Sequence, residues 1–222
     1  MQKLIKITDL YSEIPKYLTP LFFPYTYPWE ILPKIKAFIE DFIKNPPDGY
    51  AEIEKGVLVG ENVSISKTAT ILPPCIIGND TEIRPGAYIR GSVIIGQGCV
   101  VGNSTELKNC ILLDKTQAPH YNYIGDSILG KSSHLGAGSI CSNLKSDGKC
   151  VVIHAESEIE TGLRKVGAFL GDNADVGSSC VLNPGTVIGK NTSVYPLNAL
   201  RGVYPESCII KSPQTVIKRR TL

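Results

Sequence analysis

The sequence predicts an all-β fold, a left-handed parallel β-helix of hexapeptide repeats. The first observation behind this prediction is a run of ten aliphatic residues, each six positions after the last: Val59, Ile65, Ile71, Ile77, Ile83, Ile89, Ile95, Val101, Leu107 and Leu113. The second is the residue four positions after each of the first nine, which is mostly small and mostly apolar. An α-helix repeats every 3.6 residues and a half-buried strand every two, so a period of six indicates a solenoid whose unit is one short strand and a turn.

A second ladder of the same period lies near the C-terminus and extends the predicted rod. Its members are Leu170, Val176, Leu182, Ile188, Val194 and Leu200. We therefore expect one β-helix domain over residues 51–210, with loop excursions near 114–123 and 140–167, where the period is interrupted. Within the second excursion, Lys149–Ile153 and Glu158–Thr161 alternate as the strands of a hairpin do. In left-handed β-helices three hexapeptides make one coil of a triangular prism, so residues 18 apart are expected to stack on one face.

The two ends of the chain differ from the rod. Residues 1–50 contain seven of the prolines and the single Trp, and apolar residues recur with helical spacing between Trp29 and Ile43. We expect this segment to form a helical cap over the first open coil, because the end of a solenoid exposes strand edges and core. Residues 211–222, which include Lys218, Arg219 and Arg220, are expected to form a basic C-terminal tail.

Composition excludes several classes of function. The 23 Lys and Arg residues against 21 Asp and Glu give a net charge of +2, which does not favour nucleic-acid binding. No apolar run is long enough to span a bilayer, and the N-terminus does not resemble a signal peptide, so a cytoplasmic protein with reduced thiols is expected. Cys75, Cys99 and Cys180 occupy the small slot of the repeat and are expected to be buried and unpaired. No spacing of Cys and His indicates a metal site.

Four stretches carry a resemblance to a known family. They are Gly102–Asn109 (GNSTELKN), Pro119–Asp126 (PHYNYIGD), Leu135–Ser139 (LGAGS) followed by Asn143, and Thr161–Asp172 (TGLRKVGAFLGD). These motifs resemble the acetyltransferase domain of the bifunctional N-acetylglucosamine-1-phosphate uridyltransferase/glucosamine-1-phosphate acetyltransferase family, in the style of its archaeal sugar-phosphate members. Pro28-Trp29-Glu30 is similar to the end of that family's nucleotidyltransferase domain. The glycine-rich nucleotidyltransferase signature itself is absent from these 222 residues, so pyrophosphorylase activity is not expected.

The resemblance implies transfer of an acetyl group from acetyl-CoA to the amine of an amino-sugar phosphate, in a homotrimer with the site between neighbouring prisms. A protonated amine needs a base before it can attack a thioester, and the resemblance assigns this role to His120. It makes Tyr123 and Asn143 the groups that hold the oxyanion or the substrate. His134 and Lys149 match positions that contact the acceptor, although the family more often has Asn at the position of His134.

The resemblance also assigns charged groups to the phosphates. Lys108 matches a phosphate-binding lysine, and either Arg84 or Arg90 could join it. Arg90 lies 18 residues before Lys108 and is therefore expected directly beside it, about 4.8 Å away in the neighbouring strand. For acetyl-CoA, Ala137 and Ser178 match backbone positions along the pantetheine arm. Arg164 and Lys165 could neutralise the phosphates of coenzyme A.

Two alternatives to this function stay open at the level of sequence. The chain could acylate another sugar or nucleotide acceptor, or it could be a catalytically silent β-helix that binds a sugar nucleotide or a partner enzyme. The residue at position 134 favours a silent protein, whereas His120 together with Lys108 and Arg90 favours an enzyme.

Overall fold

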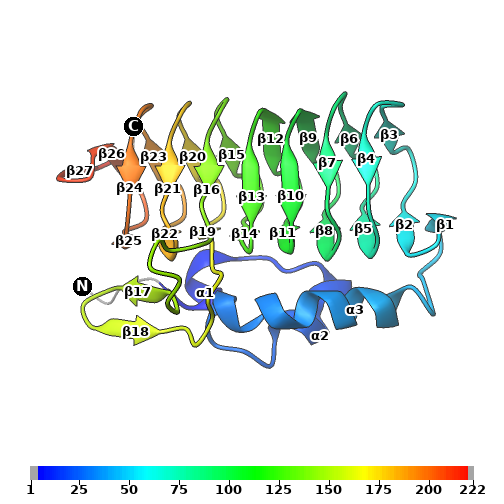
Figure 1. Cartoon of the computed structure of the whole chain (residues 1–222), viewed down its shortest axis with the longest axis horizontal. Coiled ribbons are helices and arrows are strands. Elements are labelled where there is room, and N and C mark those ends of the chain that lie inside the picture. The colour runs from blue at the N-terminus through cyan, green and yellow to red at the C-terminus, as the bar shows by residue number, and fades with distance from the viewer. Residues whose placement is uncertain (1–4, 220–222) are drawn as a thin grey trace.

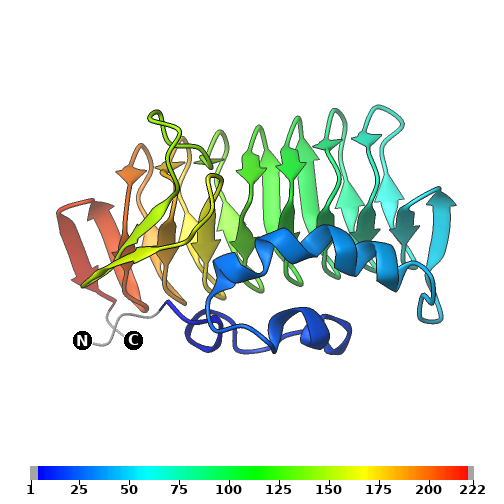
Figure 2. The ribbon, with the colours of Figure 1, turned by 60° about the horizontal axis from the view of Figure 1, so that its bottom comes forward.

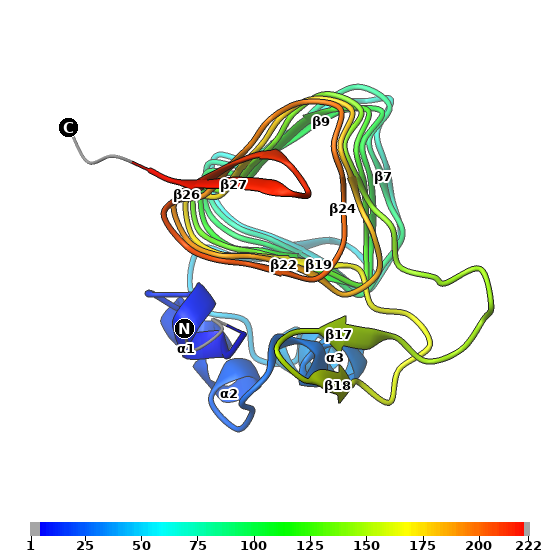
Figure 3. The same cartoon turned by 90° about the vertical axis from the view of Figure 1, so that its left-hand side faces the viewer.

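The computed structural model describes residues 5–219 as a left-handed parallel β-helix, which confirms the predicted fold class. Short strands follow one another around three flat sides, so that the rod is a triangular prism when viewed along its axis (Figure 3). Seen from the side, successive coils stack along the length of the molecule (Figure 1). We name the three sides sheets A, B and C after the order in which the chain crosses them.

Each sheet takes every third strand of the rod. Sheet A contains β1 (Ala51–Glu54), β2 (Val57–Val59), β5 (Cys75–Ile77), β8 (Val93–Ile95), β11 (Cys110–Leu112), β14 (Ile128–Leu129), β19 (Ala168–Leu170), β22 (Thr186–Ile188) and β25 (Val203–Tyr204). Sheet B contains β3 (Ser64–Ile65), β6 (Glu82–Ile83), β9 (Val100–Asn103), β12 (Gln117–His120), β15 (His134–Leu135), β20 (Asp175–Val176), β23 (Ser193–Val194), β26 (Cys208–Ser212) and β27 (Thr215–Lys218). Sheet C contains β4 (Thr70–Ile71), β7 (Tyr88–Ile89), β10 (Glu106–Lys108), β13 (Tyr123–Gly125), β16 (Ile140–Cys141), β21 (Val181–Leu182) and β24 (Ala199–Leu200).

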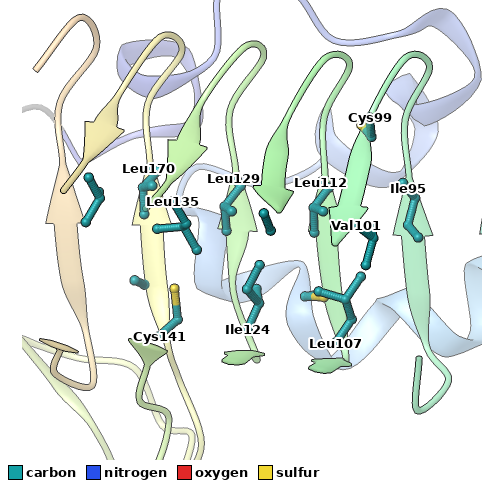
Figure 4. Packing of buried hydrophobic residues seen from close by; sticks show 14 of the residues in the cluster. Ile95, Cys99, Val101, Leu107, Leu112, Ile124, Leu129, Leu135, Cys141 and Leu170 are labelled. Atoms are coloured by element: carbon teal, nitrogen blue, oxygen red, sulfur yellow. The ribbon is translucent and has the colours of Figure 1, made fainter. Parts of the chain in front are cut away.

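The interior of the prism is filled by the large aliphatic residue of each repeat. Figure 4 shows these side chains stacked in columns, with Ile95, Leu112, Leu129 and Leu170 in successive strands of sheet A. The small slot also faces inward, and where it holds threonine the hydroxyl group donates to a carbonyl of the next coil, as Thr81 does to Gly96 at 2.8 Å. The small residues thus satisfy backbone acceptors that the large ones cannot reach.

The excursion expected at 114–123 does not exist. Leu112, not Leu113, faces the interior, because Leu112 pairs with Ile95, 17 residues earlier. The coil is therefore one residue shorter than the others, and β12 continues sheet B inside the supposed loop, paired with β9 and β15. Leu113 is also buried, but it belongs to a cluster outside the prism. The prediction was wrong because two adjacent leucines fit the period equally well.

The second excursion is real and contains the expected hairpin. The chain leaves the rod after β16 and returns at β19, so that Leu129 pairs with Leu170, 41 residues later. Between them β17 (Val152–His154) and β18 (Glu158–Glu160) pair antiparallel. The hairpin lies beside the N-terminal helices rather than on the rod (Figure 3).

The N-terminal segment lies along sheet A and does not cap the first coil, which corrects the expected cap (Figure 2). Its elements are α1 (Ile7–Leu10), η1 (Lys16–Leu18), α2 (Thr19–Phe22), η2 (Pro28–Glu30), η3 (Leu32–Lys34) and α3 (Ile35–Phe42). The reason is that the outward position of sheet A is apolar in coil after coil: Leu58, Ile76, Ile94, Ile111, Ile128, Phe169 and Val187. These side chains are buried under Trp29, Ile31, Ile35 and Ile39, which supplies a second core.

The ends of the rod are closed by antiparallel strands instead. β1 pairs with β2 at the first coil, and β27 folds back on β26 at the last, so residues 211–218 of the expected tail belong to a hairpin. Arg220 lies outside the described residues. Cys75, Cys99 and Cys180 are buried and unpaired, as expected. Within residues 5–219, no helix is long and apolar enough to cross a membrane.

Candidate functional site

Two basic side chains stand next to each other on the outer surface of sheet C. Leu107 pairs with Ile89, and the Arg90 backbone N–H donates to the Leu107 carbonyl at 2.8 Å, so Arg90 and Lys108 are neighbours in register. Arg84 follows Ile83, which pairs with Val101 in sheet B. The register chosen from the 18-residue spacing is therefore confirmed, and the two cations form one pair on one face.

Each cation of this pair has an acidic partner. The Arg90 guanidinium donates to Glu106 at 2.7 Å, and both side chains are partly exposed. The Lys108 ammonium lies 3.2 Å from Asp126 Oδ2. Because exposed ion pairs are worth little in water, Arg90 can exchange Glu106 for a bound anion at small cost. Lys108 is held more firmly, since Asp126 is buried.

Asp126 organises the corner between sheets C and A. Its carboxylate accepts hydrogen bonds from Lys108, from the Asn109 amide at 2.8 Å and from the Asn143 amide. A buried carboxylate is stable only with such donors. Asn143, which begins the second excursion, is thereby fixed to the end of β13.

Tyr123 lies across its own strand toward Asn143. Gly125, two residues on, makes room for it, because a Cβ atom at position 125 would lie 2.5 Å from the Tyr123 hydroxyl oxygen and 2.7 Å from the Asn143 amide nitrogen. Burial raises the pKa of the Tyr123 hydroxyl, and the nearby Asp126 and Glu106 carboxylates raise it further. The phenol therefore stays protonated near neutral pH and can donate a hydrogen bond.

His120 ends β12 at the corner between sheets B and C. It pairs with Asn103, its carbonyl accepts from Gly138 N–H at 3.0 Å, and the Ala137 carbonyl accepts from Ser179 N–H at 2.8 Å. His120, Ala137 and Ser178 thus follow one another along this corner. The imidazole is exposed and has no hydrogen-bond partner among residues 5–219.

The remaining candidate residues are spread over other parts of the surface. His134 faces outward from sheet B, where its Nδ1 lies 2.8 Å from Asp175. Lys149, Arg164 and Lys165 lie on the second excursion. Arg164 and Lys165 border a cleft with Asp126 and are not on the corner that holds Ala137 and Ser178.

Sequence reasoning missed three residues of this region, namely Glu106, Gly125 and Asp126. Gly125 and Asp126 are the last two residues of the PHYNYIGD motif, and Asp126 lies 18 residues after Lys108, so a signal was present. Their roles depend on side-chain contacts that spacing does not reveal.

The arrangement can perform two tasks on two neighbouring surfaces. The face of sheet C offers fixed cations beside a protonated phenol and an amide, which suits a phosphorylated, hydroxyl-rich ligand. The corner at His120 offers an accessible imidazole, which is able to take a proton near neutral pH. No group of three or more His, Cys, Asp or Glu side chains that could hold a metal ion occurs in residues 5–219.

Comparison with known proteins gives relatives along the whole chain. The family model described as the GMPPB C-terminal domain matches residues 71–164. The protein named Bifunctional protein GlmU from Methanococcus vannielii is 31% identical over 226 residues, which is 99% of this chain and 53% of that protein. The Bifunctional sugar-1-phosphate nucleotidylyltransferase/acetyltransferase from Sulfurisphaera tokodaii is 30% identical over 174 residues, or 76% of this chain and 43% of that protein.

The chain spans about half the length of the curated relatives that it matches. Among solved structures, a mutant of AntD, an N-acyltransferase from Bacillus cereus in complex with dTDP and coenzyme A, superposes with a TM-score of 0.43 at 19% identity, over 79% of this chain and 92% of that one. The relatives confirm the resemblance seen in the motifs.

Proposed function

Since the chain is homologous, along nearly its whole length, to proteins named Bifunctional protein GlmU, we propose that it is an acyltransferase that acetylates the amine of an amino-sugar phosphate with acetyl-CoA. The observation that carries the proposal is the pair Arg90 and Lys108 on sheet C, next to Tyr123 and Asn143 and one corner away from His120. Relatives in name alone would not need this arrangement.

The proposed reaction is a single acyl transfer. Neutral His120 takes a proton from the acceptor ammonium or amine, and the amine nitrogen attacks the thioester carbonyl of acetyl-CoA. The C–N bond forms as the C–S bond breaks, and the thiolate of coenzyme A leaves and is protonated. The Tyr123 hydroxyl or the Asn143 amide donates to the substrate or the developing oxyanion.

Phosphate recognition is assigned to Arg90 and Lys108. Strands in a sheet lie about 4.8 Å apart, so the two side chains can hold one phosphate between them. Ala137 and Ser178, which follow His120 along the corner, are proposed to lie beside the pantetheine arm. His134 and Lys149 are proposed to contact the acceptor.

We further propose that the protein is a homotrimer. The His120 corner and the outer face of sheet C point in different directions on one chain (Figure 3). A three-fold assembly would set the corner of one prism against the face of its neighbour and close the contact without open ends. Both halves of the site would then meet at each interface.

The direct test is release of free coenzyme A thiol from acetyl-CoA in the presence of glucosamine 1-phosphate, galactosamine 1-phosphate and their nucleoside diphosphate derivatives. The assay should use Cys150→Ser, because Cys150 is the exposed thiol among residues 5–219 and would react with the reagent. Transfer that requires the amino group and a phosphate supports the proposal. Binding of sugar phosphates without any thiol release would favour the silent, ligand-binding alternative.

A further inference from the structure

A cleft of about 610 Å³ opens at the corner between sheets C and A, directly beyond Lys108. Asn109 and Asp126 line its inner side. Asp126 connects the cleft to the cation pair, because its Oδ2 is only 3.2 Å from the Lys108 ammonium. A ligand whose phosphate rests on Lys108 can therefore continue around the corner into the cleft.

The outer walls of the cleft come from outside the rod. Leu32 and Pro33 belong to the N-terminal segment, and Leu144 and Leu163 belong to the second excursion. These four residues present apolar surface to the space between them. Binding sites for small molecules typically have volumes of about 300–1,000 Å³ with mainly apolar walls and a few polar groups, so this cleft has the size and character of one.

The charge of the cleft is positive. Arg164 and Lys165 line it, and neither forms an ion pair with an acidic side chain in the described part of the chain. The Arg164 guanidinium is held in place by a hydrogen bond from Nε to the Gly148 carbonyl at 3.0 Å. The acidic group of the cleft, Asp126, is already neutralised by Lys108.

We propose that this cleft binds the nucleotide part of the acceptor, so that the acceptor is a nucleoside diphosphate amino sugar and not a free sugar 1-phosphate. This inference rests on the proposed function. The phosphate next to the sugar would contact Arg90 and Lys108, and the second phosphate would contact Arg164 and Lys165. The base would lie against the four apolar residues of the outer walls.

A free sugar 1-phosphate would leave most of the cleft without a partner. It has a single phosphate, which Arg90 and Lys108 can satisfy, and no apolar group for the walls. If the acceptor is nucleotide-linked, a nucleotidyl transfer must precede the acetylation.

The binding test uses calorimetry on the full chain with UDP, CDP, dTDP, GDP and inorganic diphosphate. At least one nucleoside diphosphate should bind about tenfold more tightly than inorganic diphosphate. Arg164→Ala and Lys165→Ala should each weaken that binding about tenfold, since each removes a charge-assisted hydrogen bond. Lys55→Ala removes an exposed lysine of the β1–β2 turn and should change nothing.

A steric variant makes the test independent of charge. Leu144 is 46% exposed, so Leu144→Trp can fill the cleft without disturbing the core, and it should abolish the preference for nucleoside diphosphates over inorganic diphosphate. Equal binding of all five probes to the wild-type protein, or wild-type binding by all three cleft variants, would overturn the inference.

A kinetic arm separates this inference from the proposed function. The acceptors are glucosamine 1-phosphate and the glucosamine derivative of the nucleotide that binds best. A kcat/KM at least tenfold higher for the nucleotide-linked acceptor supports the inference. A kcat/KM that is equal or higher for glucosamine 1-phosphate overturns the inference and leaves the proposed function standing, whereas absence of transfer to both overturns the function.

Discussion

The Tyr123 hydroxyl group occupies the space that a side chain on Gly125 would need: a Cβ atom there would lie 2.5 Å from the hydroxyl oxygen. Both residues belong to β13, so the strand is bare at one position to let a neighbour's side chain lie across it. The same Cβ atom would lie 2.7 Å from the Asn143 amide nitrogen. Gly125 is therefore a positioning residue for both polar groups.

Gly125→Ala should lower kcat/KM by up to about 100-fold, because displacing a contacting group by about 1 Å has effects of that size. Steady-state kinetics with acetyl-CoA and the acceptor measures this. A double-mutant cycle with Tyr123→Phe provides the control: since both changes act on one hydroxyl, their combined loss should be smaller than the product of the single losses. Independent effects would contradict the positioning role.

His120→Ala should lower kcat by about 10²–10⁴-fold with little change in acceptor binding, because it removes a general base that acts in the transition state. The imidazole is exposed and has no partner among the described residues, so the fold should be unaffected. His134→Ala, on sheet B, should instead raise the acceptor KM. Full turnover by His120→Ala would remove the catalytic assignment.

Asp126→Asn should destabilise the protein by about 1–3 kcal/mol, because the new amide group opposes the amide donors of Asn109 and Asn143 and leaves Lys108 without a counter-charge. Urea unfolding at neutral pH measures the loss. Glu106→Gln is the matched control. Its ion pair with Arg90 is partly exposed, so the change should be below about 1 kcal/mol. Equal losses in the two variants would show that Asp126 has no special structural role.

Phe169→Ala should detach the N-terminal segment from sheet A before the rod unfolds. Phe169 is buried, its ring centroid is 6.1 Å from that of Trp29, and truncating such a side chain costs about 3–5 kcal/mol. Trp29 is the single tryptophan, so its fluorescence reports on the segment while far-ultraviolet circular dichroism reports on the rod. The fluorescence transition should move to lower urea than the dichroism transition. In Ile217→Ala, which alters a 41% exposed residue of β27, the two should stay together.

Stability should fall as the pH is raised from 8 to 10. Burial raises the pKa of Cys99 and of Cys141 to about 12 and raises that of Cys75 as well. Unfolded thiols ionise near pH 8.5, so above this value the unfolded state binds fewer protons than the native one and is favoured. Each such thiol lowers the free energy of unfolding by up to about 1.4 kcal/mol per pH unit in this range.

Urea unfolding in a reductant at pH 7, 8, 9 and 10 measures this dependence. Cys150→Ser should follow the wild-type curve, because Cys150 is exposed. A flat or rising profile would contradict the assignment of the buried thiols as neutral groups.

The rod could be predicted because its interior repeats every six residues, and the pairing of Arg90 with Lys108 followed from the same period. The shorter coil at Leu112 could not, since Leu112 and Leu113 are both aliphatic and only backbone pairing distinguishes them. The position of the helical segment was readable in principle, because Leu58, Ile76 and Ile94 repeat every 18 residues at an outward position. The contacts of Asp126 were not, because they join three segments around a corner whose coil length was misread.

The second excursion leaves the rod after β16 and returns to it at β19, one strand above β14, without shifting any strand. Each coil is bonded only to the coils next to it, so a loop with both ends at one corner can lengthen, shorten or change its sequence while the scaffold stays the same. The conserved geometry of the prism and the variable chemistry of the loop can thus evolve separately. Exchange of residues 142–166 between homologues is therefore the simplest way to change what such a protein recognises.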